Sequence, residues 1–110
     1  MGTPGRAWDD STVVSTIKNY FLPNEMKLYP PYPNPFNPQT HITFSVDKTT
    51  FISINIYDIN GRLVQNIHDK KTSVGYYQLI WNSDNISSGI YFVVLQSEDK
   101  VKTHKLMLMK

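Results

Sequence analysis

The sequence predicts an all-β domain: an antiparallel, immunoglobulin-like sandwich of about seven short strands with a proline-rich N-terminal arm. Three observations support this prediction. Short segments of alternating apolar and polar residues recur along the chain, and turns rich in glycine, asparagine and serine separate them at regular spacing. No helical periodicity interrupts these segments after residue 21. We therefore place the sandwich domain at residues 22–110.

The composition fits a single folded domain. The 110 residues, 40% of them hydrophobic and 13% aromatic, suffice for one core and are too few for two. The chain has no cysteine, which excludes disulfides and thiol chemistry. Its net charge of +2 is too small to indicate a nucleic-acid partner. No apolar run approaches the length of a membrane span, and the start of the chain lacks the apolar core of a signal peptide.

The first 21 residues form a separate segment, which we expect to be a leader, a linker or a docking segment. Residues 1–9 contain two glycines and a proline, as a cut linker would, so the chain is expected to be part of a larger protein. Residues 10–21 could form a capped helix with Val13 and Ile17 on one face. Their many β-branched side chains favour a strand instead, and both alternatives stay open.

A short strand is expected at residues 26–29, and the proline-rich arm follows it at residues 29–38. The five prolines of the arm fix φ and push each preceding residue towards extended geometry, which excludes a helix or a central strand. A rigid linker or a polyproline ligand would fit this composition. However, Tyr32 and Phe36 alternate with proline and asparagine, which favours an arm that folds onto its own domain. In that arrangement the aromatic rings pack, and the asparagine side chains hydrogen-bond nearby backbone.

Residues 40–46 alternate cleanly, and a short turn leads from them into a hairpin at residues 51–67. One face of the first hairpin strand carries three isoleucines, at positions 52, 54 and 56, and is expected to be buried. Asn60-Gly61 tolerates positive φ, so the chain reverses there.

The register of this hairpin depends on the length of its loop. A two-residue turn would set Ile56 opposite Gln65. A three-residue loop over residues 59–61 pairs Ile56 with Val64 and Asp58 with Arg62. We favour the second register, because it pairs apolar side chains and places opposite charges at the neck of the hairpin.

The second half of the chain is expected to supply the remaining strands. A polar loop at residues 68–73 precedes a strand at 75–81, whose inward face carries Tyr77, Leu79 and Trp81. Residues 82–89 form a loop rich in turn residues. Residues 90–95 are apolar on both faces, which indicates a central strand covered on each side. Residues 13–21 or a partner are the candidates for the outer cover.

A turn at residues 97–100 leads to the last strand, residues 101–109. Three lysines, at positions 100, 102 and 105, could blunt an exposed edge there.

Several motifs follow one another in a specific order: Tyr32-Pro-Asn-Pro-Phe-Asn-Pro38, Gly61-Arg-Leu-Val64, Ser88-Gly-Ile-Tyr-Phe92 and the closing Lys105-Leu-Met-Leu-Met-Lys110. Together they resemble the type A C-terminal sorting domain of proteins exported by the bacterial type IX secretion system, from about residue 22 to 110. The residues that carry this resemblance are Tyr32, Pro33, Asn34, Pro35, Phe36, Asn37, Pro38, Asp58, Gly61, Arg62, Trp81, Gly89 and Tyr91. Pro31 departs from the family, which more often has a polar residue there. A related immunoglobulin-like domain of flagellar hook-capping proteins shares the hairpin and residues 81–92, but not the terminal lysine motif.

The resemblance implies a non-catalytic module at the end of a larger secreted protein. An outer-membrane translocon and its sorting machinery would recognise it, and an upstream cargo domain would be fused to it. In many members the domain is removed as the cargo is anchored to lipopolysaccharide on the surface of a Gram-negative cell. Recognition is expected on the last strand, at Lys102, Lys105, Leu106, Met107, Leu108, Met109 and Lys110, with strand addition at its edge as the mode.

No motif for chemistry is evident, and neither a cofactor nor a metal is expected. His41, His68 and His104 lie on separate segments without the spacing of metal ligands. We expect His68 to be exposed in a loop and the other two to lie on strand surfaces. Residues 82–85 offer oxygens to calcium, but they lack the density of carboxylates that such sites usually have, which favours a turn. No nucleophile motif or phosphate loop is present, so the chain is not expected to be an enzyme.

Two other functions stay open. A carbohydrate-binding or adhesive module of a glycan-degrading enzyme could use Tyr76, which faces outward, whereas Trp81 alternates with Leu79 and is expected in the core. A structural spacer or homo-oligomerisation unit could use the apolar strand at residues 90–95. The cargo and the oligomeric state are not determined by the sequence.

Overall fold

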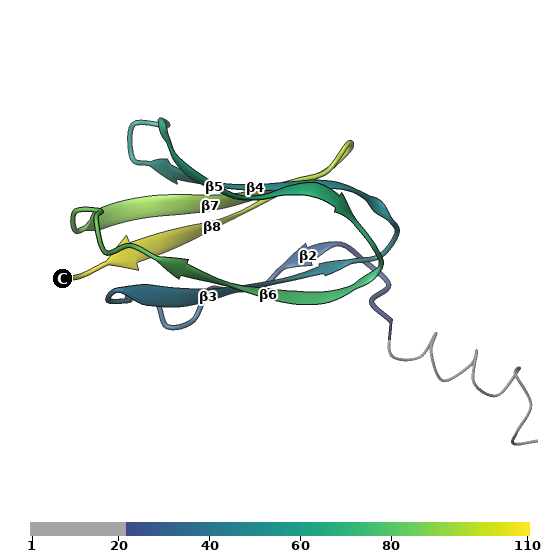
Figure 1. Ribbon diagram of the computed structural model, residues 1–110, viewed down its shortest axis with the longest axis horizontal. Helices are drawn as coiled ribbons and strands as arrows, with labels where there is room; N and C mark the ends of the chain where they lie inside the picture. The colour runs from purple at the N-terminus through teal and green to yellow at the C-terminus, as the bar shows by residue number, and fades with distance from the viewer. Residues whose placement is uncertain (1–21) are drawn as a thin grey trace, which may run out of the picture.

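The computed structural model describes residues 22–110, and the alternatives for residues 10–21 lie outside the described part. The described residues form two antiparallel sheets that face each other (Figure 1). One sheet has three strands in the order β2-β3-β6, and the other has four in the order β5-β4-β7-β8. The strands are β2 (Lys27–Leu28), β3 (Gln39–Val46), β4 (Thr50–Asp58), β5 (Leu63–Thr72), β6 (Gly75–Asn82), β7 (Gly89–Gln96) and β8 (Val101–Leu108). This arrangement confirms the predicted all-β sandwich.

Residues 22–110 contain no helix, so this part of the chain has no helical segment that could cross a membrane.

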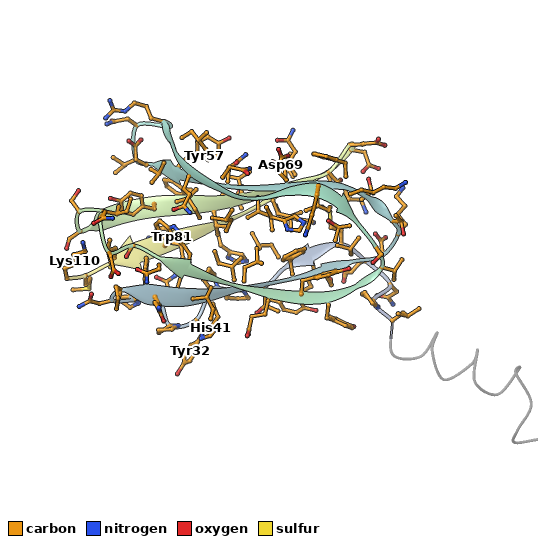
Figure 2. The ribbon with its side chains drawn as sticks, in the orientation of Figure 1. Tyr32, His41, Tyr57, Asp69, Trp81 and Lys110 are labelled. Carbon is orange, nitrogen blue, oxygen red and sulfur yellow. The ribbon has the colours of Figure 1, made fainter. Side chains whose placement is uncertain are left out.

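Alternation along the strands fills the space between the sheets. The predicted inward residues of β3 and β4 are fully buried, as is Trp81 of β6 at 1% exposure. Figure 2 shows Trp81 pointing into the space between the two layers. Burial of each large apolar side chain contributes roughly 1.5–3 kcal/mol to stability. The core comprises Met26, Leu28, Phe36, Ile42, Phe44, Val46, Ile52, Ile54, Ile56, Trp81, Tyr91, Val93, Leu95, Leu106 and Leu108.

The neck of the β4–β5 hairpin agrees with the predicted three-residue loop. The Asp58 N–H donates to the Arg62 carbonyl at 2.9 Å, and the two side chains form an ion pair at 3.3 Å. The Gly61 N–H donates to the Asp58 carbonyl at 3.0 Å, and Gly61 has a φ of 81°, in the left-handed region that favours glycine.

The prediction that Ile56 faces Val64 is wrong, because a β-bulge intervenes. Tyr57 pairs with Leu63, but Ile56 pairs with Gln65, which leaves Val64 as the extra residue. The bulge places the Gln65 amide on the inner side, where its Oε1 accepts a hydrogen bond from Trp81 Nε1 at 3.0 Å. This bond satisfies the buried indole N–H. In the predicted register Gln65 would lie on the outer face and could not accept it.

The prediction of a loop at residues 68–73 is wrong, because strand β5 continues through this polar run to Thr72. The long strand β4 requires a partner along its first residues, and Asp69–Thr72 provide it. A second bulge between Asn66 and His68 brings His68 opposite Ile54, whose side chain is buried.

His68 is therefore half-buried rather than exposed. Its ring lies 5.6 Å from the Phe44 ring, and its Nε2 is hydrogen-bonded to Thr72 Oγ1 at 2.8 Å. Burial lowers the pKa of His68, the charge of Lys70 lowers it further, and Asp69 opposes the shift.

Strand β7 is central, as predicted, and lies between β4 and β8. Tyr91, Val93 and Leu95 face the core, and the residues between them are half-buried on the outer face. On this outer face, Phe92 lies between two cross-strand partners, Tyr57 of β4 and Lys105 of β8. The candidate cover at residues 13–21 lies outside the described residues.

Candidate recognition surface on the last strand

Strand β8 is an edge strand, and the proline-rich arm runs along part of its outer edge. Beyond β2, the arm first continues along β3, where Tyr32 and His41 exchange two backbone hydrogen bonds of 3.1 and 2.8 Å. It then crosses to the other sheet, where the Phe36 N–H donates to Met107 at 2.9 Å and the Met109 N–H donates to Phe36 at 3.0 Å. The arm thus connects both sheets on the side where β2 contacts β8.

The arm docks through its own side chains, as predicted for Phe36 and not for Tyr32. Phe36 is 2% exposed and packs against Trp81 with the ring centroids 5.4 Å apart. Tyr32 is 77% exposed and points away from the sandwich (Figure 2). The prediction that Tyr32 packs is wrong, because its backbone pairs with β3 with the side chain on the outer face.

Asn34 occupies the place of a neighbouring strand beside β8. Its Nδ2 donates to the Lys105 carbonyl at 2.8 Å, and its Oδ1 accepts the Met107 N–H at 2.9 Å. The asparagine therefore hydrogen-bonds backbone, as expected, but on a strand 71 residues away. Three X–Pro bonds of the arm, before Pro33, Pro35 and Pro38, are cis.

Two buried residues hold the arm at Pro33 and at its last residue, Pro38. Thr40 Oγ1 donates to the Pro33 carbonyl at 2.8 Å. The Ser83 hydroxyl and the Ser83 N–H both donate to the Pro38 carbonyl, at 2.8 and 3.0 Å. Both Thr40 and Ser83 are fully buried, so these bonds satisfy polar groups that water does not reach.

The seven residues predicted for recognition divide between two environments. Leu106 and Leu108 are 0% and 1% exposed and belong to the core. In the folded domain they cannot contact a receptor, so they support β8 rather than form a surface. The exposed members are Lys102, Lys105, Met109 and Lys110, and Met107 is half-buried.

Only some of these residues lie together. Lys105 and Met107 both lie on the outer face of the four-stranded sheet. Their partners on β7, Phe92 and Ile90, lie beside them. Met109 follows them at 57% exposure. We call this group of five residues the terminal face. Lys102 lies near the other end of β8 and, by alternation, on the opposite side of the strand.

Lys110 is held by the β6–β7 loop. Its N–H donates to Ser88 Oγ at 3.0 Å, and its Nζ donates to the Asp84 carbonyl at 2.9 Å. Residues 83–88 are a loop, as predicted, and polar groups of this loop hold Lys110 in place after the end of β8.

The other motif residues are structural in this arrangement. Trp81 packs between Phe36 and Tyr91, with a centroid distance of 5.9 Å to Tyr91. The Tyr91 hydroxyl donates to the Ser87 carbonyl at 2.6 Å. Asp58 accepts the Arg62 N–H, which is the main reason its pKa lies below the usual value; the Asn60 N–H and the Arg62 charge act in the same direction.

The three histidines lie on three different strands, β3, β5 and β8. His41 lies on strand β3 and His104 on strand β8. The prediction that His104 lies on a strand surface is wrong, because it pairs with core-facing Val93 and its Nε2 donates to the Leu28 carbonyl of the opposite sheet at 2.9 Å. Within residues 22–110, no three histidine or acidic side chains come together as metal ligands would.

Residues 31–109 match the family model of the secretion system C-terminal sorting domain. The chain belongs to this family. The family is the C-terminal sorting signal of type IX secretion, a non-catalytic module, so membership implies contact with that secretion machinery and an upstream cargo. It also implies a secreted or cell-surface protein of a bacterium. The comparison with curated proteins found no match.

The sorting-domain match begins at residue 31 and therefore includes the arm that covers β8. Sequence reasoning placed the motif residues of the arm but did not find what they bind. Asn34 carries no local signal for a partner on β8, since its hydrogen bonds depend on how two distant segments are brought together.

Proposed function

We propose that the terminal face is the surface that the type IX machinery reads, and that the chain delivers a fused cargo through the outer membrane of a Gram-negative bacterium to the cell surface. In this role the domain performs no catalysis itself. The observation that supports this proposal is the combination of a firmly held strand and an exposed face on it. Asn34 and Phe36 fix the backbone of β8, while Lys105 and Met109 remain exposed.

The proposed contact is made by side chains rather than by strand addition along residues 105–109. Four outward backbone groups of that half of β8 already bond to the arm: the Lys105 carbonyl, the N–H and carbonyl of Met107, and the Met109 N–H. A receptor strand could pair there only after the arm leaves, which would expose the buried Phe36 ring. A lysine and two methionines beside half-buried Ile90 and Phe92 instead offer an apolar surface with one positive charge, suited to a receptor patch with an acidic residue.

An export assay with charge-changing substitutions tests the proposal. A signal peptide and a fluorescent cargo would be fused upstream of the 110-residue chain and expressed in a bacterium with a type IX system. We expect Lys105→Glu with Met109→Glu to retain the cargo in the periplasm and to reduce surface fluorescence by about tenfold. Both side chains are exposed, so the fold should tolerate the changes, which circular dichroism of the purified chain would verify.

The matched control lies on the opposite edge of the same sheet. Lys71→Glu with Leu63→Glu makes the same change in charge on β5, where Leu63 is 58% exposed, against 57% for Met109. Export of this control should equal that of the unchanged chain. Normal export of the terminal-face variant, or equal loss in both variants, would contradict the proposal.

Removal of residues 105–110 would be a weaker test than these substitutions. Leu106 and Leu108 are core residues, so the deletion would leave a cavity between the sheets and unfold the sorting domain. Loss of export would then not separate recognition from folding. The family match gives no support to the carbohydrate-binding alternative.

A further inference from the structure

Strand β6 presents an edge that no described residue covers. It is the outermost strand of its sheet and pairs only with β3. The Ser83 N–H donates to the Pro38 carbonyl, and alternation of the ladder then directs the backbone groups of Tyr77, Leu79 and Trp81 towards β3. The N–H and C=O groups of Tyr76, Gln78 and Ile80 therefore point outward, and none bonds to a described residue.

The other three sheet edges carry the protections that natural sheets use against strand pairing. The arm occupies the outer edge of β8 at residues 105–109. Strand β5 has two bulges and carries Lys70 and Lys71, and β2 is only two residues long. Strand β6 is eight residues long, has a regular register with β3, and contains no charged residue and no proline.

The side chains of this edge are self-complementary. Tyr76 and Ile80 are 58% and 59% exposed, which are large exposed fractions for such side chains. Gln78 lies midway between them on the same outer face. An antiparallel partner centred on Gln78 would place tyrosine opposite isoleucine on both sides of the centre. Aromatic and β-branched residues are favourable cross-strand neighbours, and two glutamine amides can hydrogen-bond to each other.

We propose that a second copy of this chain docks on this edge, with β6 pairing antiparallel to β6 of the second copy around a two-fold axis at Gln78. The outward backbone groups of Tyr76, Gln78 and Ile80 then satisfy those of Ile80, Gln78 and Tyr76 of the second copy. The two three-stranded sheets join into one continuous sheet. No like charges oppose each other along the junction, because β6 has none.

The contact is one strand wide, which is small for a permanent dimer, so association is concentration-dependent and weak. The proposal is independent of the sorting function: it uses a different sheet from the terminal face, and each can fail alone.

Sedimentation velocity of the full 110-residue chain over a range of concentrations tests the proposal. A two-fold axis at Gln78 places residue 78 directly opposite its own copy. Gln78→Lys and Gln78→Glu should therefore each raise the dimer dissociation constant by about tenfold. An equimolar mixture of the two variants should restore dimers at least as well as the unchanged chain, because opposite charges then meet.

Thr103→Lys is the matched control. Thr103 is an exposed strand residue on β8, in the half of that edge which the arm leaves open. This variant should dimerise like the unchanged chain. Loss of dimers in Thr103→Lys with no effect of Gln78→Lys would overturn the proposal in favour of the β8 edge. A chain that stays monomeric at every concentration would overturn it outright.

Cysteine cross-linking tests the register, because the chain has no cysteine of its own. Opposed residues of a hydrogen-bonded pair lie about 5.5 Å apart at Cα, within reach of a disulfide. Gln78→Cys should oxidise to a covalent dimer by itself. Tyr76→Cys alone and Ile80→Cys alone should each form no covalent dimer, and the two variants should cross-link only when they are mixed. Efficient self-linking of Tyr76→Cys would exclude the proposed register.

Discussion

Asn34 binds the backbone of Met107 as an adjacent strand would, accepting its N–H at 2.9 Å through the side-chain oxygen. The amide nitrogen of the same side chain donates to the carbonyl of Lys105 at 2.8 Å. One asparagine in a proline-rich arm thus satisfies two backbone groups on the outer edge of β8. The last strand is thereby held on both sides, by β7 and by the arm.

Replacement of Asn34 should loosen this edge. We expect Asn34→Ala to lower the free energy of unfolding by about 1–2 kcal/mol, because two hydrogen bonds to backbone are lost. Amide hydrogen exchange should accelerate at Met107, whose N–H loses its acceptor. Asn37→Ala is the control, since Asn37 is exposed and makes no side-chain hydrogen bond within residues 22–110. Unchanged protection at Met107 in the Asn34 variant would count against this role.

The two aromatic residues of the arm should differ sharply in their contribution to stability. Phe36→Ala removes a ring that is 2% exposed and packed on Trp81, and should cost about 3–5 kcal/mol in denaturant unfolding. Tyr32→Ala removes a ring that is 77% exposed, and should change stability by less than about 0.5 kcal/mol. Similar losses in both variants would show that the arm does not dock through Phe36.

The stability of the domain should decrease as the pH falls below about 6.5, the ordinary pKa of histidine. Burial lowers the pKa of His68 in the folded state, so the unfolded chain takes up the proton first. Neutral His68 makes its full contribution to the free energy of unfolding above about pH 6.5. That contribution is lost as the pH falls through the pKa of His68 in the folded state.

His68→Phe keeps a ring against Phe44 and should flatten this part of the pH profile. The denaturant concentration at the unfolding midpoint would be measured above and below about pH 6.5. An NMR titration of the His68 ring would give its pKa in the folded state. A His68 midpoint above that of a free histidine would refute the prediction.

Gly61 should be required for its backbone conformation and not for space. No atom lies within 4 Å of the position that a Cβ would occupy, but the φ of 81° is unfavourable for other residues. Gly61→Ala should therefore cost about 1 kcal/mol in chemical denaturation, and Gly61→Asn should cost less, because asparagine tolerates this region better. Equal stability of all three chains would show that the turn adapts to the side chain.

Residues close in sequence were predicted well where a local pattern decided the outcome. The neck at Asp58 and Arg62 followed from loop length and charge, and the alternation around Ile54 and Phe44 placed both in the core. The register beyond the neck was not predictable, because the bulge at Val64 turns Gln65 towards a hydrogen bond with the Trp81 indole, a residue far along the chain. Trp81 belongs to the other sheet, so no pattern within the hairpin indicates this partner.

The candidate surface shows the same division. Its lysines and methionines were placed on the last strand from sequence, but the burial of Leu106 and the covered edge beside Met107 were not foreseen. Both depend on the arm and on the opposite sheet, which contact β8 only in the folded chain.

The sequence by itself determined which side of each strand is apolar, where the hairpin turns and to which family the motifs belong, because these properties reside in neighbouring residues. Only the tertiary structure decided which edges are covered and which side chains of β8 remain accessible. The reason is physical: a hydrogen bond between Asn34 and Lys105 closes a loop of 71 residues, and no local preference encodes its partner.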